Sequence, residues 1–410
     1  MSFDPIVVKK DFPLLEREIN GRSIVYLDSA NTSQKPRQVI DAMSRFTETS
    51  YAPINRSAYQ LAAESTDAFE AARAAVRRFI NAPKVQEVIF TKNATEALNL
   101  VAQSWGVANL RAGDAILLTH MEHHANIVPW HMLAAERGVE LRWVPLTADG
   151  LLDLTNLPTL LDGAKIFSFT AMSNVLGTLT PVRQLVDAAH AAGAIAIVDG
   201  CQYVPHNPTD VQAWGADFVA FSSHKLCGPS GIGVLWGRET LLEEMPPFLG
   251  GGNMIADVRL DGFSCAELPA KFEAGTPAIT EAVGMHAAIS YLSSLGMDNV
   301  RAHEVEVTTY AIDKLKTRYG DDITIHGPVD PAVRGATLSF KFKDVHPHDV
   351  SQVLDQSNVC VRAGHHCAKP LMKLLGANAT ARASFYIYNS TADADALADA
   401  LANAGDLFGF

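Results

Sequence analysis

A lysine at the end of an apolar run is the first residue of this sequence with evident chemistry. The run from Ala216 ends in Ser222 and Ser223, a Gly/Pro-rich turn follows, and a second apolar run extends from Ile232 to Trp236. This pattern predicts strand, loop and strand, with Lys225 at the end of the first strand. A neutral lysine forms Schiff bases with carbonyl cofactors, and an apolar setting favours the neutral amine. An isolated lysine after a strand is usually only a surface residue, so this hypothesis depends on its neighbours in the fold.

A carboxylate after another apolar run is the second candidate. Asp199 follows four apolar residues and precedes Gly200, Cys201 and Gln202, so it is expected to be partly buried and to need a partner. In a pyridoxal phosphate (PLP) site that partner is the pyridine nitrogen, whose proton the carboxylate holds so that the ring can accept electrons. The alternative is an Asp that caps the next helix. The 26-residue interval between Asp199 and Lys225 suits one connection and one strand, which places both side chains at neighbouring strand ends.

A phosphate group could bind where a strand turns into a helix, at Asn93-Ala94-Thr95, because the free N–H groups and dipole of a helix N-terminus attract anions. Ser222 and His224 could supply further donors. This signal is weak alone, because the sequence has neither a GxGxxG motif nor a Walker lysine loop. His123 could stack on a flat ring and move protons. The alternatives are a metal ligand or a hydrogen-bonded core histidine, and the core histidine is favoured when the residue is considered by itself.

One cysteine has the surroundings of a nucleophile. Cys367 lies in a short Gly-containing loop after His365 and His366, with Arg362 and Lys369 nearby, and positive neighbours favour a thiolate. A metal site made of the two histidines and the cysteine is the alternative, but adjacent residues rarely face one ion.

Length and composition limit the class of protein. The 410 residues suit one large domain plus a smaller one, and 48% apolar residues allow a sizeable core. The net charge of −12 argues against a nucleic-acid or anionic-membrane partner. The five cysteines are widely spaced without a CxxC pair, which indicates a reducing compartment. We see no signal peptide and no apolar run near the roughly 20 residues of a membrane span, so we expect a cytoplasmic protein. Three cysteines lie in or beside apolar runs, namely Cys201, Cys227 and Cys360. We expect them to pack as small core residues.

Strands and helices alternate through the first two thirds of the chain. This βαβ pattern predicts an α/β fold with a mainly parallel sheet, covered by helices on both faces, and a ligand site beyond the carboxyl ends of the strands. Residues 11–21 are interpreted as a short helical lead-in and residues 23–27 as a strand. The further strands are expected at 88–91, 115–119, 141–144, 166–170 and 195–198, and the helices at 62–80, 95–105, 127–137 and 182–192.

The alternation loosens after residue 250, and the last part of the chain reads as a separate α+β unit. It is expected to contain strands near Ile323, at 336–342 and at 359–362, with helices at 347–356 and 392–407, after a helix that ends near residue 294. We therefore predict a large cofactor-binding domain at 20–294 and a small α+β domain, formed by 1–19 and 295–410, that carries the cysteine loop.

These motifs together resemble the cysteine desulfurases of the class V aminotransferase family, and most closely their group II, or SufS-type, branch. The resemblance extends from Tyr26 to Ser384, and its most specific part is Gly364-His-His-Cys367, because the other branch carries its cysteine in a longer, serine-rich loop. The stretches that carry it are Met121–Trp130, Ser173–Gly177, Val198–Gln202, Ser222–Lys225, Gly228–Gly233, Phe272–Pro277 and Arg362–Met372.

The resemblance implies a fold type I PLP enzyme, with a mainly parallel sheet of the seven-stranded type. It implies a homodimer that converts L-cysteine to L-alanine, leaves a persulfide on Cys367 and supplies a SufE- or SufU-like acceptor protein for iron–sulfur cluster assembly. Lys225 would hold PLP and move the substrate's Cα proton, Asp199 would pair with the pyridine nitrogen, Gln202 would meet the ring hydroxyl, and His123 would stack on the ring. The implied phosphate ligands are Ala94, Thr95, Ser222, His224 and, from the other subunit, Thr276. The implied substrate ligands are Asn174, Arg382 and Arg362.

Two stretches depart from the family's common pattern, namely Asn55-Arg56-Ser57 and Asn31-Thr32. Both are expected near the entrance of the active site, where they would affect substrate handling or the acceptor interface.

Three alternative functions remain open at this point. Selenocysteine lyase or cysteine sulfinate desulfinase activity would use the same scaffold, but those substrates have better leaving groups and need less help from Cys367. A metal-dependent hydrolase would use the histidine pairs and contain metal. A non-catalytic scaffold would keep the fold, although Lys225 argues against it.

Overall fold

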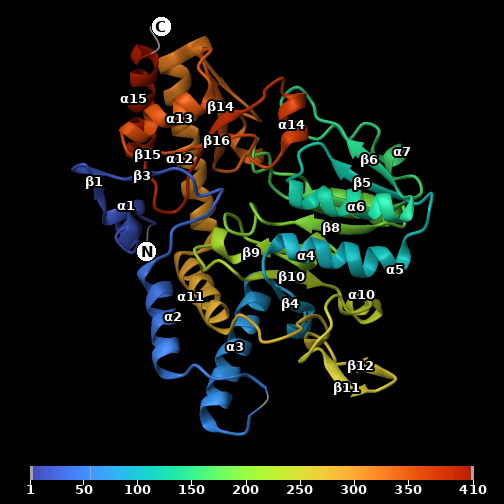
Figure 1. Cartoon of the computed structure of the whole chain (residues 1–410). Helices are drawn as coiled ribbons and strands as arrows, with labels where there is room; N and C mark the ends of the chain where they lie inside the picture. The colour runs from blue at the N-terminus through green and yellow to red at the C-terminus, as the bar shows by residue number, and fades with distance from the viewer. Residues whose placement is uncertain (1–2, 56, 408–410) are drawn as a thin grey trace.

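Apolar runs of the first two thirds of the chain form a central sheet in the computed structural model, which describes residues 3–55 and 57–407 (Figure 1). The sheet has seven strands in the order β4-β10-β9-β8-β7-β5-β6. The strands from β9 to β6 are parallel, whereas β10 pairs antiparallel with both β9 and β4, so the predicted mainly parallel sheet is confirmed. The bounds are β4 Val88–Thr91, β5 Ala115–Thr119, β6 Glu140–Val144, β7 Ala164–Thr170, β8 Ile195–Asp199, β9 Phe218–Ser222 and β10 Gly233–Gly237.

Helices cover both faces of this sheet, as predicted. Successive side chains of a strand point to opposite faces, and neighbours such as Ile197 and Val198 accordingly join different apolar clusters. One cluster contains α4 (Ala94–Val101) and α6 (Val128–Arg137). The other contains α3 (Gln60–Phe79), α8 (Val182–Ala191) and α11 (Ile279–Leu295). The predicted helix 95–105 corresponds to α4, the π-helical turn Ala102–Gly106 (η3) and α5 (Val107–Asn109).

The prediction of a helix over residues 11–21 is wrong. The segment contains the 3-10 turn Pro13–Glu16 (η1) and a hairpin of β1 (Glu18–Ile19) and β2 (Arg22–Ser23), and the nearby helix α1 (Pro5–Lys9) comes earlier. The reason is the dipeptide Asn20-Gly21, whose φ angles of 53° and 72° match the two-residue turn that joins hairpin strands.

Several elements were not predicted from the sequence, and the longest of them is α12 (Met297–Tyr319). Its sequence is mostly polar, but Val300, Val307, Ala311 and Leu315 recur at helical spacing and are buried. The shorter unpredicted elements include α2 (Arg37–Thr49), α7 (Leu157–Leu161), α9 (Val211–Trp214), α10 (Glu239–Glu244), α14 (Lys369–Leu374), the hairpin strands β11 (Ile255–Arg259) and β12 (Gly262–Cys265), and the strand β17 (Thr380–Ser384).

A second, four-stranded antiparallel sheet forms the core of the C-terminal part, at the top of Figure 1. Its order is β13-β14-β17-β16, and α12, α13 (Pro347–Gln356) and α15 (Thr391–Leu407) pack with it in one apolar cluster. The predicted α+β character and terminal helix are thus confirmed; Leu397 and Leu401 of that helix are buried. The remaining bounds are β13 Ile323–Ile325, β14 Thr337–Phe342, β15 Val359–Cys360, β16 Arg362–Gly364, α14 Lys369–Leu374 and β17 Thr380–Ser384.

The early strand β3 (Val25–Tyr26) lies with the C-terminal part, because it pairs in parallel with β15. Leu27 is also buried in the apolar cluster of the small sheet. The domain limits at residues 20 and 295 stay a prediction. Of the departing stretch Asn55–Ser57, Arg56 lies outside the described residues.

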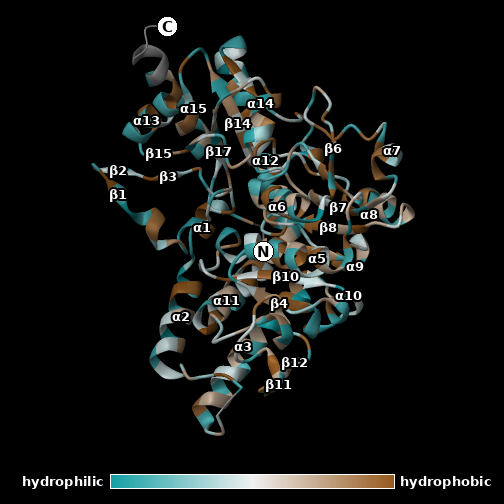
Figure 2. Cartoon of the chain, turned by 45° about the vertical axis from the view of Figure 1, so that its right-hand side comes forward, coloured by the Kyte–Doolittle hydropathy of each residue, from teal (hydrophilic) through white to brown (hydrophobic). Residues whose placement is uncertain are grey.

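The helices alternate hydrophilic and hydrophobic segments along their length (Figure 2). In the ranges 3–55 and 57–407, no helix is both long enough and apolar enough to span a bilayer.

Candidate active site

The carboxyl ends of β7, β8 and β9 border a cavity of about 240 Å³. The strand-end rule places a ligand site there. Of the predicted site residues, Thr276 lines a separate cavity with Lys92 and Glu96. The others all line the one cavity: Ala94, Thr95, His123, Asn174, Asp199, Gln202, Ser222, His224, Lys225, Arg362, Cys367 and Arg382.

Lys225 reaches this cavity because the chain turns immediately after a buried strand. Every residue of β9 is buried, and the 3-10 turn Ser223–Lys225 (η5) follows it. The turn packs tightly, since a Cβ at Gly228 would lie 2.1 Å from the Ser223 Oγ. The lysine is therefore placed by a rigid strand and a turn without spare room.

Asp199 and Gln202 lie at the neighbouring strand end. Asp199 is buried, and its Oδ1 accepts the Cys201 N–H at 3.0 Å; burial raises the pKa of this carboxyl, and the Lys225 charge partly opposes the rise. Gln202 donates from Nε2 to the Ala30 carbonyl at 2.7 Å. Its buried Oε1 has no hydrogen-bond partner among the described residues. A buried acceptor of this kind requires a donor, which the ring hydroxyl of PLP would provide.

The N-terminus of α4 forms the anion-attracting end of the cavity. The Asn93 side chain caps the helix by accepting the Glu96 N–H, and the Ala94 N–H donates to the Ser222 Oγ, each at 2.9 Å. His224 contacts the Thr32 Oγ1 through Nδ1 at 3.2 Å, and burial lowers its pKa to about 4. Neutral donors and a helix N-terminus thus meet where the phosphate of PLP would bind.

His123 presents a neutral ring. Burial, with the nearby Lys225 charge, lowers its pKa to about 3. Its Nδ1 accepts the Ala125 N–H at 3.0 Å, which assigns the proton of the neutral ring to Nε2. A flat, uncharged imidazole with one free N–H suits stacking on a PLP ring.

A buried glutamate, which the sequence interpretation missed, fixes the loop that carries His123. Glu122 accepts hydrogen bonds from the Thr119 hydroxyl, the Thr170 N–H and the Asn126 amide at 2.5, 3.0 and 2.7 Å. Burial raises the pKa of Glu122 to about 8. The sequence interpretation also missed Thr170. This residue is the last of β7, so the rule that ligand sites lie at the carboxyl ends of parallel strands would have indicated it.

The cysteine loop has an unusual backbone. His366 and Cys367 have φ angles of 51° and 55°, a region that side chains other than glycine disfavour. The Cys367 carbonyl accepts the His124 N–H and the His366 carbonyl accepts the Asn174 Nδ2–H, each at 2.7 Å. The Lys369 N–H donates to the His124 Nε2 at 3.0 Å. Residues of the large sheet's loops thus hold the loop of the small unit.

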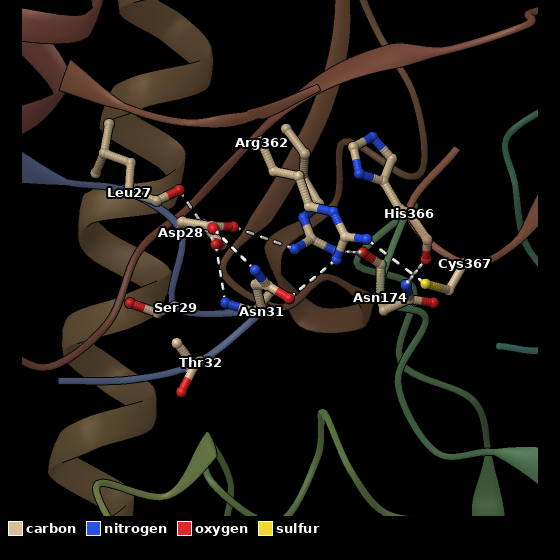
Figure 3. A network of polar contacts seen from close by, with 12 residues as sticks. Leu27, Asp28, Ser29, Asn31, Thr32, Asn174, Arg362, His366 and Cys367 are labelled. Carbon is tan, nitrogen blue, oxygen red and sulfur yellow. Dashed lines mark hydrogen bonds and ion pairs between the residues drawn. The ribbon is translucent and has the colours of Figure 1, made fainter. Parts of the chain in front are cut away.

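Two arginines lie opposite each other on the strands behind this loop, because β16 and β17 pair Arg362 with Arg382. Arg382 is buried, donates to the Asn174 carbonyl at 3.0 Å and lies 3.4 Å from Asp28. Burial lowers its pKa to about 10, and its Nε has no partner among the described residues. Arg362 contacts the Cys367 Sγ at 3.5 Å (Figure 3). The unpartnered Nε–H of Arg382, together with the contact of Arg362 with the thiol, suits a substrate that carries both a carboxylate and a sulfur.

The other cysteines differ from Cys367 in their surroundings. All five are free. Cys227 is buried in the core, where burial raises its pKa to about 12. Cys201 lines the cavity beside Asp199, although the sequence pattern indicates a core role. Within the described residues, no group of three or more His, Cys, Asp or Glu side chains could hold a metal ion, so the metal-dependent hydrolase has no ligand set in that part of the chain.

Comparison with known proteins places this site in a class. The model of the aminotransferase class-V family matches residues 25–397. The chain therefore belongs to the aminotransferase class-V family, whose members are PLP-dependent enzymes of fold type I.

Two relatives that resemble the chain over its whole length are named as a probable cysteine desulfurase and a cysteine desulfurase. The chain is 50% identical to a probable cysteine desulfurase of Streptomyces coelicolor, over 99% of this chain and 98% of the relative. It is 45% identical to a cysteine desulfurase of Escherichia coli O127:H6, over the full length of both chains.

Solved structures of cysteine desulfurases share the fold of this chain. The crystal structure of the cysteine desulfurase CsdA from Escherichia coli matches with a TM-score of 0.92 and 38% identity, over 99% of this chain and 100% of CsdA. The apo cysteine desulfurase of Thermococcus onnurineus NA1 matches with a TM-score of 0.93 and 37% identity, over 98% of each chain. The predicted family and fold are thus confirmed.

Proposed function

We propose that this chain removes the sulfur of L-cysteine with PLP bound at Lys225, releases L-alanine and holds the sulfur as a persulfide on Cys367. The observation that carries the proposal is the joint placement of Lys225, Asp199, Arg382 and Cys367 around one cavity. The names of the relatives support the choice of substrate.

The position of each residue in the cavity determines its proposed role. Arg382 and the Asn174 side chain bind and orient the substrate carboxylate. Bound PLP supplies an electron sink for the bonds at the substrate's Cα and Cβ. Lys225, once free, takes the Cα proton, and the neutral His123 donates its Nε2–H nearby.

Cys367 completes the transfer. Its thiolate attacks the substrate sulfur, the new S–S bond forms as the substrate's Cβ–S bond breaks, and the electron pair of that bond stays with Cβ. Protonation of Cβ then gives alanine, so the enzyme thiol and cysteine yield a persulfide and alanine without any added oxidant or reductant.

A second copy of the chain and an acceptor protein extend this proposal. In a homodimer, Thr276 of one copy would complete the phosphate site of the other. A small acceptor protein of the SufE or SufU kind would take the persulfide sulfur in the cytoplasm for iron–sulfur cluster assembly, from the loop that carries Cys367. Size-exclusion chromatography with light scattering tests the dimer.

The test compares cysteine-to-alanine variants. Cys367→Ala is expected to abolish alanine and sulfide production from cysteine while the cofactor absorbance of the purified protein is retained. Cys360→Ala, seven positions earlier in the same region, is the matched control and keeps the activity. Lys225→Ala is expected to lose the absorbance of lysine-bound PLP. Desulfuration by Cys367→Ala at the wild-type rate would refute the assigned nucleophile.

A further inference from the structure

A polar chain links the turn after β3 to the thiol of Cys367. Asp28 Oδ2 accepts a hydrogen bond from Asn31 Nδ2 at 3.2 Å, and Asn31 Oδ1 accepts one from Arg362 Nη1 at 3.0 Å. The other guanidinium nitrogen, Nη2, contacts the Cys367 Sγ at 3.5 Å. Figure 3 shows these side chains in sequence, with Asn31 between Asp28 and Arg362.

The guanidinium of Arg362 needs such a support, because its cross-strand neighbour is another arginine. Like charges directly opposite each other in a sheet repel, and Arg362 opposes Arg382 in the β16–β17 register. Asp28 Oδ1 lies 3.4 Å from Arg382 Nη2. The single carboxylate of Asp28 therefore serves both arginines, Arg382 directly and Arg362 through the Asn31 amide.

The turn that carries Asn31 is itself fixed. The Asp28 carbonyl accepts the N–H groups of Asn31 and Thr32 at 3.1 and 3.3 Å. The Ala30 N–H donates to the Ser384 Oγ at 2.9 Å. Ser384 is the last residue of β17, the strand that also carries Arg382, so the amide of Asn31 is held relative to both arginines.

We propose that Asn31 is a positioning residue, which holds the Arg362 guanidinium against the Cys367 sulfur and thereby sets the reactivity of that thiol. The inference rests on the proposed function only in taking Cys367 as the sulfur acceptor. A long arginine side chain loses substantial rotamer freedom when it is fixed. Without the Asn31 oxygen, the guanidinium has fewer bonds that favour the thiol-facing rotamer.

Asn31→Ala tests this in the holoenzyme, with iodoacetamide as the probe. This reagent is uncharged and has no carboxylate, so its rate reports on the thiol and not on binding of the substrate's carboxylate. Mass spectrometry of the Cys367 peptide measures alkylation at pH 7 without cysteine. We expect Asn31→Ala to slow alkylation roughly three- to tenfold, which corresponds to the net contribution of one ordinary hydrogen bond. Asn109→Ala is the matched control, because Asn109 is also exposed and donates to a helix carbonyl, that of Trp105.

A double-mutant cycle with Arg362→Ala separates positioning from a general structural effect. If Asn31 acts through the guanidinium, Asn31→Ala slows alkylation in the wild-type background and has no effect on the alkylation rate in the Arg362→Ala background. The Asn31→Ala variant is expected to keep the melting temperature and the cofactor absorbance of the wild type. An equal effect in both backgrounds, or wild-type alkylation in Asn31→Ala, overturns the inference. Failure of the proposed function is a separate result, since it would appear as full desulfuration by Cys367→Ala.

Discussion

Gly233 offers a direct test of how the sheet builds the phosphate end of the site. In β10 it lies between Thr91 of β4 and Ser222 of β9, the two strand ends that lead to Asn93 and Lys225. A Cβ at this position would lie 2.6 Å from the Asn93 Cα, 2.7 Å from its carbonyl carbon and 2.9 Å from the Phe221 carbonyl oxygen. All three are backbone atoms, so no side-chain rotation can relieve the contact.

Gly233→Ala should therefore displace the N-terminus of α4. Ordinary contact begins at 3.4 Å, so the Asn93 Cα must move by about 0.8 Å from 2.6 Å. The bond from Ala94 N–H to Ser222 Oγ, now 2.9 Å, would stretch beyond hydrogen-bonding distance if it followed that movement. We expect overpacking to cost about 1–3 kcal/mol of unfolding free energy. A loss of about 1.4–2.8 kcal/mol at the phosphate would weaken PLP binding roughly 10- to 100-fold.

The assay is titration of PLP into the cofactor-free variant, followed by the absorbance of lysine-bound PLP, with urea unfolding in parallel. Gly237→Ala is the matched control in the same strand. Its Cβ would lie 2.7 Å from the Phe218 ring, far along β10 from Asn93, so it should cost stability but keep the PLP affinity. Wild-type affinity in Gly233→Ala, or an equal loss in Gly237→Ala, would refute the reasoning.

Two further predictions concern stability. Burial, with the nearby Arg382 charge, lowers the pKa of His366 to about 2 in the folded protein. In the unfolded chain the same imidazole is protonated near pH 6.5. The stabilising contribution of neutral His366 to the free energy of unfolding is therefore complete above about pH 6.5 and falls by about 1.4 kcal/mol per pH unit below it. Urea unfolding between pH 7 and 5 should accordingly have a shallower pH dependence in His366→Gln than in the wild type. Glu273→Gln should cost about 3–5 kcal/mol in urea unfolding, because it leaves the buried Arg73, now bonded to both Glu273 oxygens at 2.6 and 2.9 Å, without its main counter-ion. Glu70→Gln, which removes an exposed partner of the same arginine, should cost less than about 1 kcal/mol.

The part of the site that lies at strand ends could be predicted from the sequence. Asn93, Asp199 and Lys225 each follow an apolar run, and parallel strands bring their carboxyl ends to one edge. Thr170 belongs to the same set but was overlooked, since nothing in its chemistry distinguishes it. The apolar run Ile232–Trp236 predicted β10 as a strand, but nothing in that run indicates its antiparallel pairing or its place between β4 and β9.

The part of the site that comes from the small unit could not be derived in this way. Arg362, Cys367 and Arg382 lie more than 130 residues after Lys225, and no periodicity indicates which edge of another sheet they face. Only the family resemblance placed them near Lys225. The supporting residues Asp28 and Asn31 act through contacts of their side chains, which a linear pattern does not contain.

The conformation of the cysteine loop depends on contacts from outside the loop. Left-handed backbone at His366 and Cys367 costs on the order of 1–2 kcal/mol per residue. The hydrogen bonds that their carbonyls accept from Asn174 and His124 contribute about 0.5–1.5 kcal/mol each. These two contributions are similar in size, so the loop keeps this shape only while the large unit's donors are in place. Asn174→Ala, which removes the side-chain donor to the His366 carbonyl, should therefore alter the position of the Cys367 thiol, whereas His124 donates from its backbone N–H and keeps that bond when its side chain is replaced by Ala.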